Sequence, residues 1–101
     1  MMPVTARRTP VTAHTDGANV VLKVSYVLDP PAGRLLVDAV AAAVANAPRR
    51  IEIDLRSLAS WTPEGARALV ECREICGDLP DGLHYRTGRG PGREALLAAY
   101  A

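Results

Sequence analysis

The side chains best suited to chemistry in this sequence are two histidines and two cysteines. His14 and His84 fall on separate predicted strands, and neither has a cysteine or aspartate at the spacing of a metal site or a catalytic triad. Cys72 and Cys76 are four positions apart in a helical pattern, which suits neither a redox Cys-x-x-Cys motif nor a zinc site. Free cysteines are usually buried, so we expect both to be small core side chains. The sequence therefore predicts no catalytic residue, no metal site, no cofactor and no enzyme activity.

A glycine-rich stretch near the C-terminus resembles a nucleotide-binding loop. Residues 88–93 read Gly-Arg-Gly-Pro-Gly-Arg between a predicted strand and a predicted helix. A dinucleotide-binding fingerprint needs its third glycine one position later, where this chain has Arg93, and a following βαβ unit with an acidic residue. We expect a flexible connection here, and a nucleotide or small-ligand site that uses Arg89 and Arg93 is the alternative.

Residues 51–65, IEIDLRSLASWTPEG, raise the clearest functional question. An alternating strand runs into a short polar loop with the only tryptophan, Trp61, and then into the first turn of a helix. Thr62 suits the N-cap, Pro63 suits the first helical position, and Glu64 places a negative charge near the positive end of the helix dipole. These residues are typical of a well-capped corner. Trp61 favours a second interpretation, contact with a partner, because tryptophan is enriched at binding hot spots.

The elements that must position this junction follow from the hydrophobic pattern. Residues 20–28 alternate between apolar and polar, and residues 51–56 repeat the alternation. This is typical of a sheet with helices on one face and water on the other, because a doubly covered sheet has continuous apolar strands. The side expected to face the helices is formed by Val20, Leu22, Val24, Tyr26, Leu28, Ile51, Ile53 and Leu55.

Helix signals separate these strands. Asp29 is a candidate N-cap before two prolines, and a second helix starts at Pro63. The complete order is β-β-α-β-α-β-α, so we predict an α/β fold with a single mixed sheet of about four strands and helices packed on one face. We expect a flexible tail over residues 1–10 and one domain over residues 11–101. The buried stripe of the second helix is predicted at Leu69, Cys72, Cys76 and Leu79.

Composition limits the classes of partner. The chain has 101 residues, 49% of them hydrophobic, and a net charge of +1. The charge gives no electrostatic reason to expect nucleic acid or an anionic membrane as partner. No apolar run is long enough to span a bilayer, and the N-terminus lacks the apolar stretch of a secretory signal. We therefore expect no membrane insertion and a cytoplasmic protein.

The order of elements and several short motifs resemble the STAS domain family, the fold of bacterial anti-sigma factor antagonists. Leu28-Asp29 is similar to that family's Leu-Asp before its first helix. Residues 51–58 are similar to its Val-Val-Leu-Asp-Leu-Ser-x-Val strand, and residues 65–70 to the Gly-Leu-x-x-Leu-Leu of its switch helix. Residues 83–86 fit the next strand. The resemblance covers residues 11–101 and implies a STAS-like fold and a protein-binding function.

At one motif this chain differs from the STAS family. In the family, Asp-Ser-Ser/Thr-Gly follows the strand, and a partner kinase phosphorylates the first serine, which breaks the complex. Matched by position, the aspartate falls on Thr62, the phosphoacceptor on Pro63, the next serine on Glu64 and the glycine on Gly65. Proline has no hydroxyl, so the standard phospho-switch cannot operate. Thr62 and Ser60 are nearby hydroxyls outside the acceptor position.

These features together predict a non-catalytic protein-binding module. The predicted partner is an anti-sigma factor of the kinase type, in bacterial transcription regulation. The alternatives are an accessory subunit of a lipid-transport ABC ATPase and a small-ligand or nucleotide sensor. We expect Trp61→Ala to weaken partner binding and leave the fold intact. The predicted contact residues are Trp61, Thr62, Pro63, Glu64, Gly65 and Arg67.

Overall fold

The computed structural model describes residues 9–101, so most of the predicted tail over residues 1–10 lies outside the described part of the chain. Pro10 is tied to the sheet, because its carbonyl accepts a hydrogen bond from the Ser25 N–H at 2.8 Å. The predicted order of elements is confirmed. The elements are β1 (Val11–Asp16), β2 (Asn19–Leu28), α1 (Pro30–Val44), β3 (Arg50–Trp61), α2 (Pro63–Ile75), β4 (Gly82–Arg86) and α3 (Pro91–Ala99).

The four strands form one mixed sheet in the order β1-β2-β3-β4. β1 and β2 form an antiparallel hairpin, whose turn needs Gly17 because its φ is +63°. β3 pairs in parallel with β2 on one side and with β4 on the other. Each parallel pair is joined by a helix, as parallel pairing requires. The fold class predicted from the sequence is therefore confirmed.

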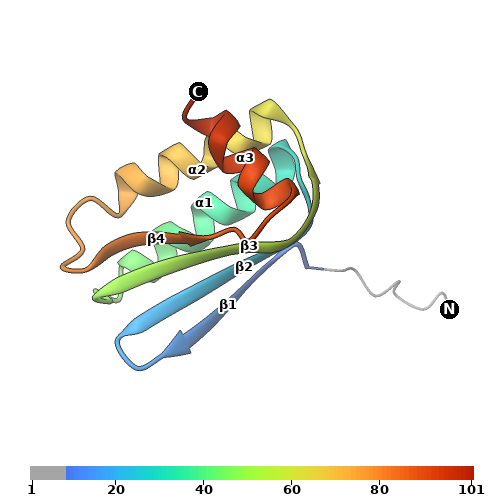
Figure 1. Ribbon diagram of the computed structural model, residues 1–101. Helices are drawn as coiled ribbons and strands as arrows, with labels where there is room; N and C mark the ends of the chain where they lie inside the picture. The colour runs from blue at the N-terminus through green and yellow to red at the C-terminus, as the bar shows by residue number, and fades with distance from the viewer. Residues whose placement is uncertain (1–8) are drawn as a thin grey trace, which may run out of the picture.

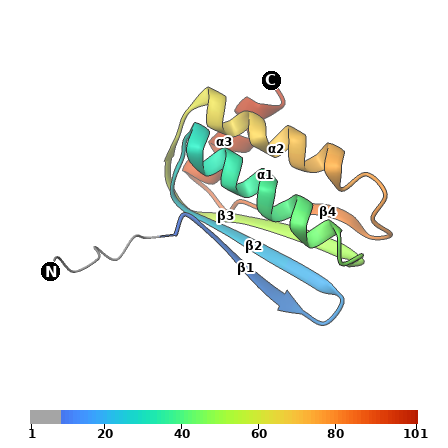
Figure 2. The same cartoon turned by 180° about the vertical axis from the view of Figure 1, so that it is seen from behind.

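All three helices cover the same face of the sheet (Figures 1 and 2). α1 packs on β2, α3 packs on β3, and α2 lies between them in contact with both other helices. No helix within residues 9–101 has the length and hydropathy of a membrane span. The layer between helices and sheet is filled by aliphatic side chains, of which the largest fully buried ones are Leu22, Val24, Leu28, Leu36, Val40, Ile51, Ile53, Leu55 and Leu69.

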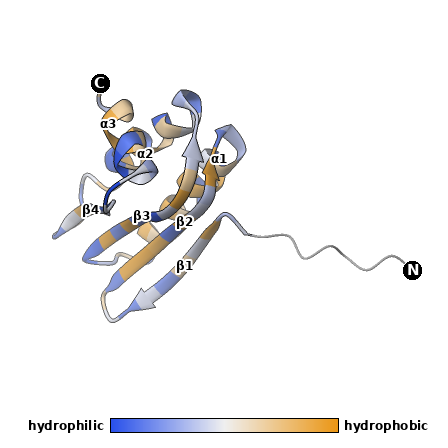
Figure 3. Cartoon of the chain, turned by 45° about the vertical axis from the view of Figure 1, so that its right-hand side comes forward, coloured by the Kyte–Doolittle hydropathy of each residue, from blue (hydrophilic) through white to orange (hydrophobic). Residues whose placement is uncertain are grey.

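Within residues 9–101, the other face of the sheet carries polar side chains and no helix. Along β2 and β3, hydrophobic and hydrophilic residues alternate (Figure 3). The predicted division of β3 is confirmed, because Ile51, Ile53 and Leu55 are fully buried while Arg56 is exposed.

Two details of the strands differ from the sequence-based expectation. β3 does not end in a polar loop after residue 56 but continues as a strand to Trp61. The register between β2 and β3 also shifts twice, between Lys23 and Ser25 and between Tyr26 and Val27. Tyr26 adopts a φ of +69°, which is unusual for a residue with a side chain, and is 42% exposed. The prediction that Tyr26 faces the helices is therefore wrong, because the irregularity interrupts the alternation.

Candidate functional site

The predicted contact surface lies where two parallel strands end side by side. Leu28, the last residue of β2, is paired with Trp61, the last residue of β3. A helix begins directly after each strand, so the first turns of α1 and α2 lie next to each other. The Thr62 N–H donates to the Leu28 carbonyl at 3.0 Å, which extends the strand pairing into the start of α2.

Both helices are capped by the residues that the sequence predicted. Asp29 Oδ1 accepts a hydrogen bond from the Ala32 N–H at 3.0 Å, and Thr62 Oγ1 accepts one from the Gly65 N–H at 3.0 Å. Both caps have extended backbone conformations, and a proline follows each of them. The caps satisfy N–H groups that would otherwise lack a partner within the helix. The Thr62 hydroxyl therefore has a structural role as the cap of α2.

Gly65 allows α2 to start against the backbone of β2. A Cβ atom at this position would overlap the carbonyl group of Leu28. The two helices are close in the next turn as well, because a Cβ on Gly33 of α1 would lie 3.1 Å from the Cβ of Ala68. Gly65 is buried, so its predicted direct contact with a partner does not fit its position. Its role is to let the first turn of α2 pack against the strand.

The remaining predicted residues reach the surface to different extents. Pro63, Glu64 and Arg67 are exposed on the first two turns of α2. Thr62 and Trp61 are half-buried, and Trp61 packs against the hydrophobic core from the end of β3. Trp61 is therefore both a core-edge residue and a surface residue, rather than a loop residue as predicted.

A groove between α1 and α2 adjoins this surface and was not predicted. Its volume is about 260 Å³. Glu64 and Glu71 lie on the α2 side, and Arg34 lies on the α1 side. The i, i+7 spacing of the two glutamates on α2 was visible in the sequence, but the pairing of α1 with α2 across Gly33 and Ala68 was not. The lining residues are Pro30, Gly33, Arg34, Val37, Glu64, Ala68 and Glu71.

The histidines and cysteines lie apart from this surface. His14 and His84 are exposed on β1 and β4. Cys72 and Cys76 are buried free thiols, as predicted, and burial raises the pKa of Cys72 to about 12. Such a thiol is protonated and a poor nucleophile at neutral pH. Among the described residues, no three His, Cys, Asp or Glu side chains gather as a metal site.

The glycines of residues 88–93 form a defined turn with packing roles. Gly88 and Gly90 have positive φ values of +61° and +105°, and Gly90 is the N-cap of α3. A Cβ on Gly92 would overlap the Leu55 carbonyl, so this glycine lets α3 pack against β3. The conformation and close packing explain these three glycines.

The sequence matches no protein-family model and no curated protein, but solved structures match the fold. A crystal structure of an anti-sigma factor antagonist from Mycobacterium paratuberculosis is 25% identical, with a TM-score of 0.73, over 89% of this chain and 77% of that one. The fold is STAS-like. The STAS-like chain also matches the anti-sigma factor antagonist SpoIIAA in its unphosphorylated form, with 13% identity and a TM-score of 0.67 over 86% of this chain and 81% of that one.

The STAS-like fold also occurs as a part of a longer protein. A crystal structure of Mglu matches 81% of this chain with a TM-score of 0.64 and 19% identity. The match covers only 20% of the Mglu chain. At this identity the likeness concerns the fold of the matched part alone.

Proposed function

We propose that the chain is a non-catalytic protein-binding module of the anti-sigma factor antagonist type. Its contact surface is the junction surface, which we define as Trp61, Thr62, Pro63, Glu64 and Arg67. The observation that carries the proposal is the exposure of Pro63, Glu64 and Arg67 on the first turns of α2. The start of this helix is held in place by the Thr62 cap and by the hydrogen bond from the Thr62 N–H to the Leu28 carbonyl. A rigid surface loses little conformational entropy on binding.

The junction surface has no hydroxyl at the position that the family phosphorylates. Pro63 occupies that position, and the nearby Thr62 hydroxyl accepts the capping hydrogen bond from Gly65. Ser60 is exposed but lies before the helix, on β3. Glu64, beside Pro63, provides a single permanent negative charge in the first turn. We propose that the module binds its partner without a phosphorylation switch at Pro63.

The proposed partner is an anti-sigma factor of the kinase type. The structural likeness to two anti-sigma factor antagonists supports this class. The second candidate is the ATPase of a lipid-transport ABC complex, for which STAS-like subunits act as accessories. Pro63 favours this second candidate, because an accessory subunit does not need a phosphoacceptor. In both cases Trp61 supplies apolar contact, and Glu64 and Arg67 set partner choice.

Affinity capture from the native cell tests the proposal when wild type and a charge-reversal variant are compared. Arg67→Glu reverses the charge at the junction surface, and Arg93→Glu on α3 is the matched control because both arginines are exposed. We expect wild type and the control to retain the same ATPase, and Arg67→Glu to retain at least about tenfold less of it. Mass spectrometry of the captured ATPase separates the kinase type from the ABC type. Equal capture by Arg67→Glu would place the contact surface elsewhere.

The absence of an acceptor at residue 63 gives a second prediction. Pro63→Ser restores a hydroxyl at the position where the family is phosphorylated. We expect a kinase-type partner with ATP to phosphorylate the Pro63→Ser variant at position 63. The wild type should not be phosphorylated at this position. Phosphosite mapping by mass spectrometry is the measurement. Stoichiometric phosphorylation of wild type at Thr62 or Ser60 would show that the switch has moved rather than disappeared.

A further inference from the structure

The open face of the sheet carries a row of charges that the proposed partner contact does not use. The strand register places Lys23 of β2, Asp54 of β3 and Arg86 of β4 side by side across three strands. Neighbouring strands are about 4.8 Å apart, so Lys23 and Arg86 lie on the strands on either side of Asp54. Lys23 and Arg86 are exposed, whereas Asp54 is 8% exposed. We call Lys23, Asp54, Arg56 and Arg86 the Asp54 cluster.

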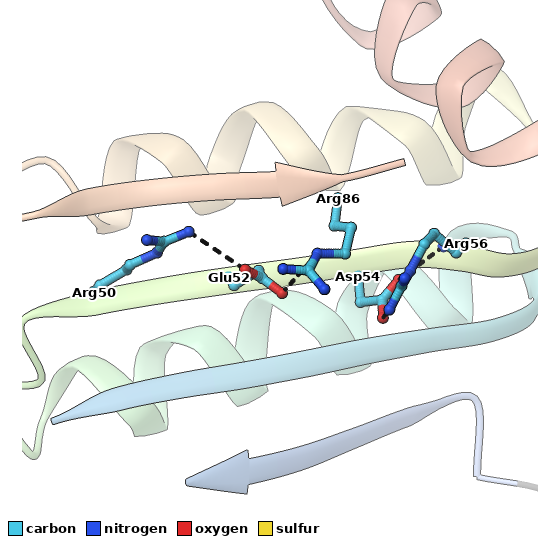
Figure 4. Close-up of polar contacts among 5 residues, drawn as sticks. All are labelled: Arg50, Glu52, Asp54, Arg56 and Arg86. Carbon is cyan, nitrogen blue, oxygen red and sulfur yellow. Dashed lines mark hydrogen bonds and ion pairs between the residues drawn. The ribbon is translucent and has the colours of Figure 1, made fainter. Parts of the chain in front are cut away.

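Arg56 is fixed in this cluster by three hydrogen bonds to one carboxylate. Its backbone N–H and its Nε each donate to Asp54 Oδ1 at 3.0 Å, and its Nη2 donates to Asp54 Oδ2 at 2.9 Å. The Arg56 guanidinium lies alongside the Asp54 carboxylate (Figure 4). The Asp54 side chain is 11% exposed and that of Arg56 is 52% exposed. The Asp54 carboxylate is thus covered, and the Arg56 guanidinium is the group exposed to solvent at this part of the open face.

Arg86 is held from the other side. Its Nε lies 3.3 Å from Glu52 Oε2, and Arg50 Nη2 donates to Glu52 Oε1 at 3.4 Å. The Arg86 guanidinium lies between Glu52 and Asp54 (Figure 4). Within residues 9–101, no hydrogen bond uses the terminal nitrogens of Arg86 or Nη1 of Arg56. The buried Asp54 and the half-buried Glu52 therefore orient these N–H groups, which remain available to a ligand.

The open face carries charges of both signs. Arg56 is hydrogen-bonded to the Asp54 carboxylate and Arg86 lies between Asp54 and Glu52, while Lys23 is paired with Asp54 in the strand register. Glu52 pairs with both Arg86 and Arg50, and Asp16 lines the same hollow, so its three arginines accompany three carboxylates. The volume of this hollow is about 360 Å³. Its lining residues are Asp16, Asn19, Val21, Arg50, Glu52, Asp54, Arg56 and Arg86.

Stability alone gives a weak reason for this arrangement, because ion pairs with half-exposed arginines contribute little to folding. Binding gives a stronger one. Fixed guanidinium groups donate paired N–H bonds that match the oxygens of a phosphate or a carboxylate. We infer that the Asp54 cluster binds the oxyanion group, phosphate or carboxylate, of a small anionic ligand through Arg56, Arg86 and Lys23. This site is separate from the junction surface, and its occupancy does not require the proposed partner.

NMR titration of the full chain tests this inference. Sodium phosphate and sodium citrate are the probes, each added at pH 7 and compared with sodium chloride at matched ionic strength, because screening alone changes surface shifts. We expect saturable shifts of the Arg56 and Arg86 backbone amides and side-chain Nε–H signals with at least one of the two oxyanions. The anion that saturates at the lower concentration identifies the preferred class.

Variants show whether the shifts come from the cluster. Lys23→Gln and Arg86→Gln should each weaken binding about tenfold, since each removes a charged contact. Arg34→Gln is the matched control, because Arg34 is an exposed arginine on the helical side of the molecule. The spectrum of each variant without anion confirms that it is folded. Shifts that are linear in concentration, equal in chloride, or unchanged in both cluster variants would overturn the inference.

Discussion

Gly65 lies where the first turn of α2 touches the end of β2, and its missing side chain has a measurable consequence. We expect Gly65→Ala to lower the free energy of unfolding by about 3 kcal/mol, because the added Cβ meets backbone that cannot move aside. Gly77→Ala is the control, since a Cβ there meets only the Glu74 carbonyl at 3.4 Å and its φ is not positive. Urea unfolding of both variants is the measurement. Similar stabilities for the two would contradict the close approach.

Asp54 gives a prediction in pH. The hydrogen bonds from Arg56 hold the pKa of the Asp54 carboxyl below its ordinary value, although burial opposes this. A lowered pKa in the folded state stabilises the protein fully above about pH 5, and this contribution is lost as the pH falls through the unfolded value towards the folded one. We expect the free energy of unfolding of wild type to fall more steeply between pH 5 and pH 2 than that of Asp54→Asn. Parallel pH profiles would show that Arg56 does not stabilise the charged form.

At the scale of elements, the N-terminus of α2 depends on the Thr62 cap. Thr62→Ala should lower the free energy of unfolding by about 1 kcal/mol, because the Gly65 N–H loses its acceptor. Thr62→Asp keeps an acceptor at the cap and should retain most of the stability. Thermal unfolding of both variants separates the two outcomes. Equal losses would mean that the hydroxyl has a role other than capping.

The sequence predicts the elements well where the pattern is local. Alternation identified the buried face of β3, and Asp29 and Thr62 were recognised as caps from their residue type and the prolines that follow. The prediction failed at Tyr26 and at the end of β3. Both errors have one cause, because the register between β2 and β3 shifts twice and each shift interrupts the period of two. Such shifts depend on the neighbouring strand, which a single strand's sequence does not describe.

The residue types of the site were likewise predictable, but their burial was not. Pro63, Glu64 and Arg67 are exposed, as a surface role requires. Gly65 is buried because the end of β2 lies beside it, and that neighbourhood comes from the parallel pairing of two strands separated by a whole helix. The groove between α1 and α2 arises in the same way. The pairing of β2 with β3 therefore determines which residues at the start of α2 are exposed to a partner.

For the whole molecule, Trp61 links partner contact to stability. Because Trp61 packs against the hydrophobic core, we expect Trp61→Ala to lower the free energy of unfolding by about 2 kcal/mol as well as to weaken binding. This revises the expectation that the fold would be unaffected. Denaturant unfolding and a binding titration with the captured partner, at a temperature where the variant is folded, measure the two effects. Leu97→Ala on α3, where Leu97 is 61% exposed, should change neither quantity.

The uncovered face of the sheet also restricts how this chain can assemble with other macromolecules. A dry interface laid over this face would have to strip water from the guanidinium groups of Arg50, Arg56 and Arg86, at several kcal/mol for each ion left without compensation. The junction surface has two ionised side chains, Glu64 and Arg67, so a partner there displaces water from fewer charges. We therefore expect large partners to bind the helices and the edges of the sheet. The charged groups of the open face remain accessible to small hydrated solutes.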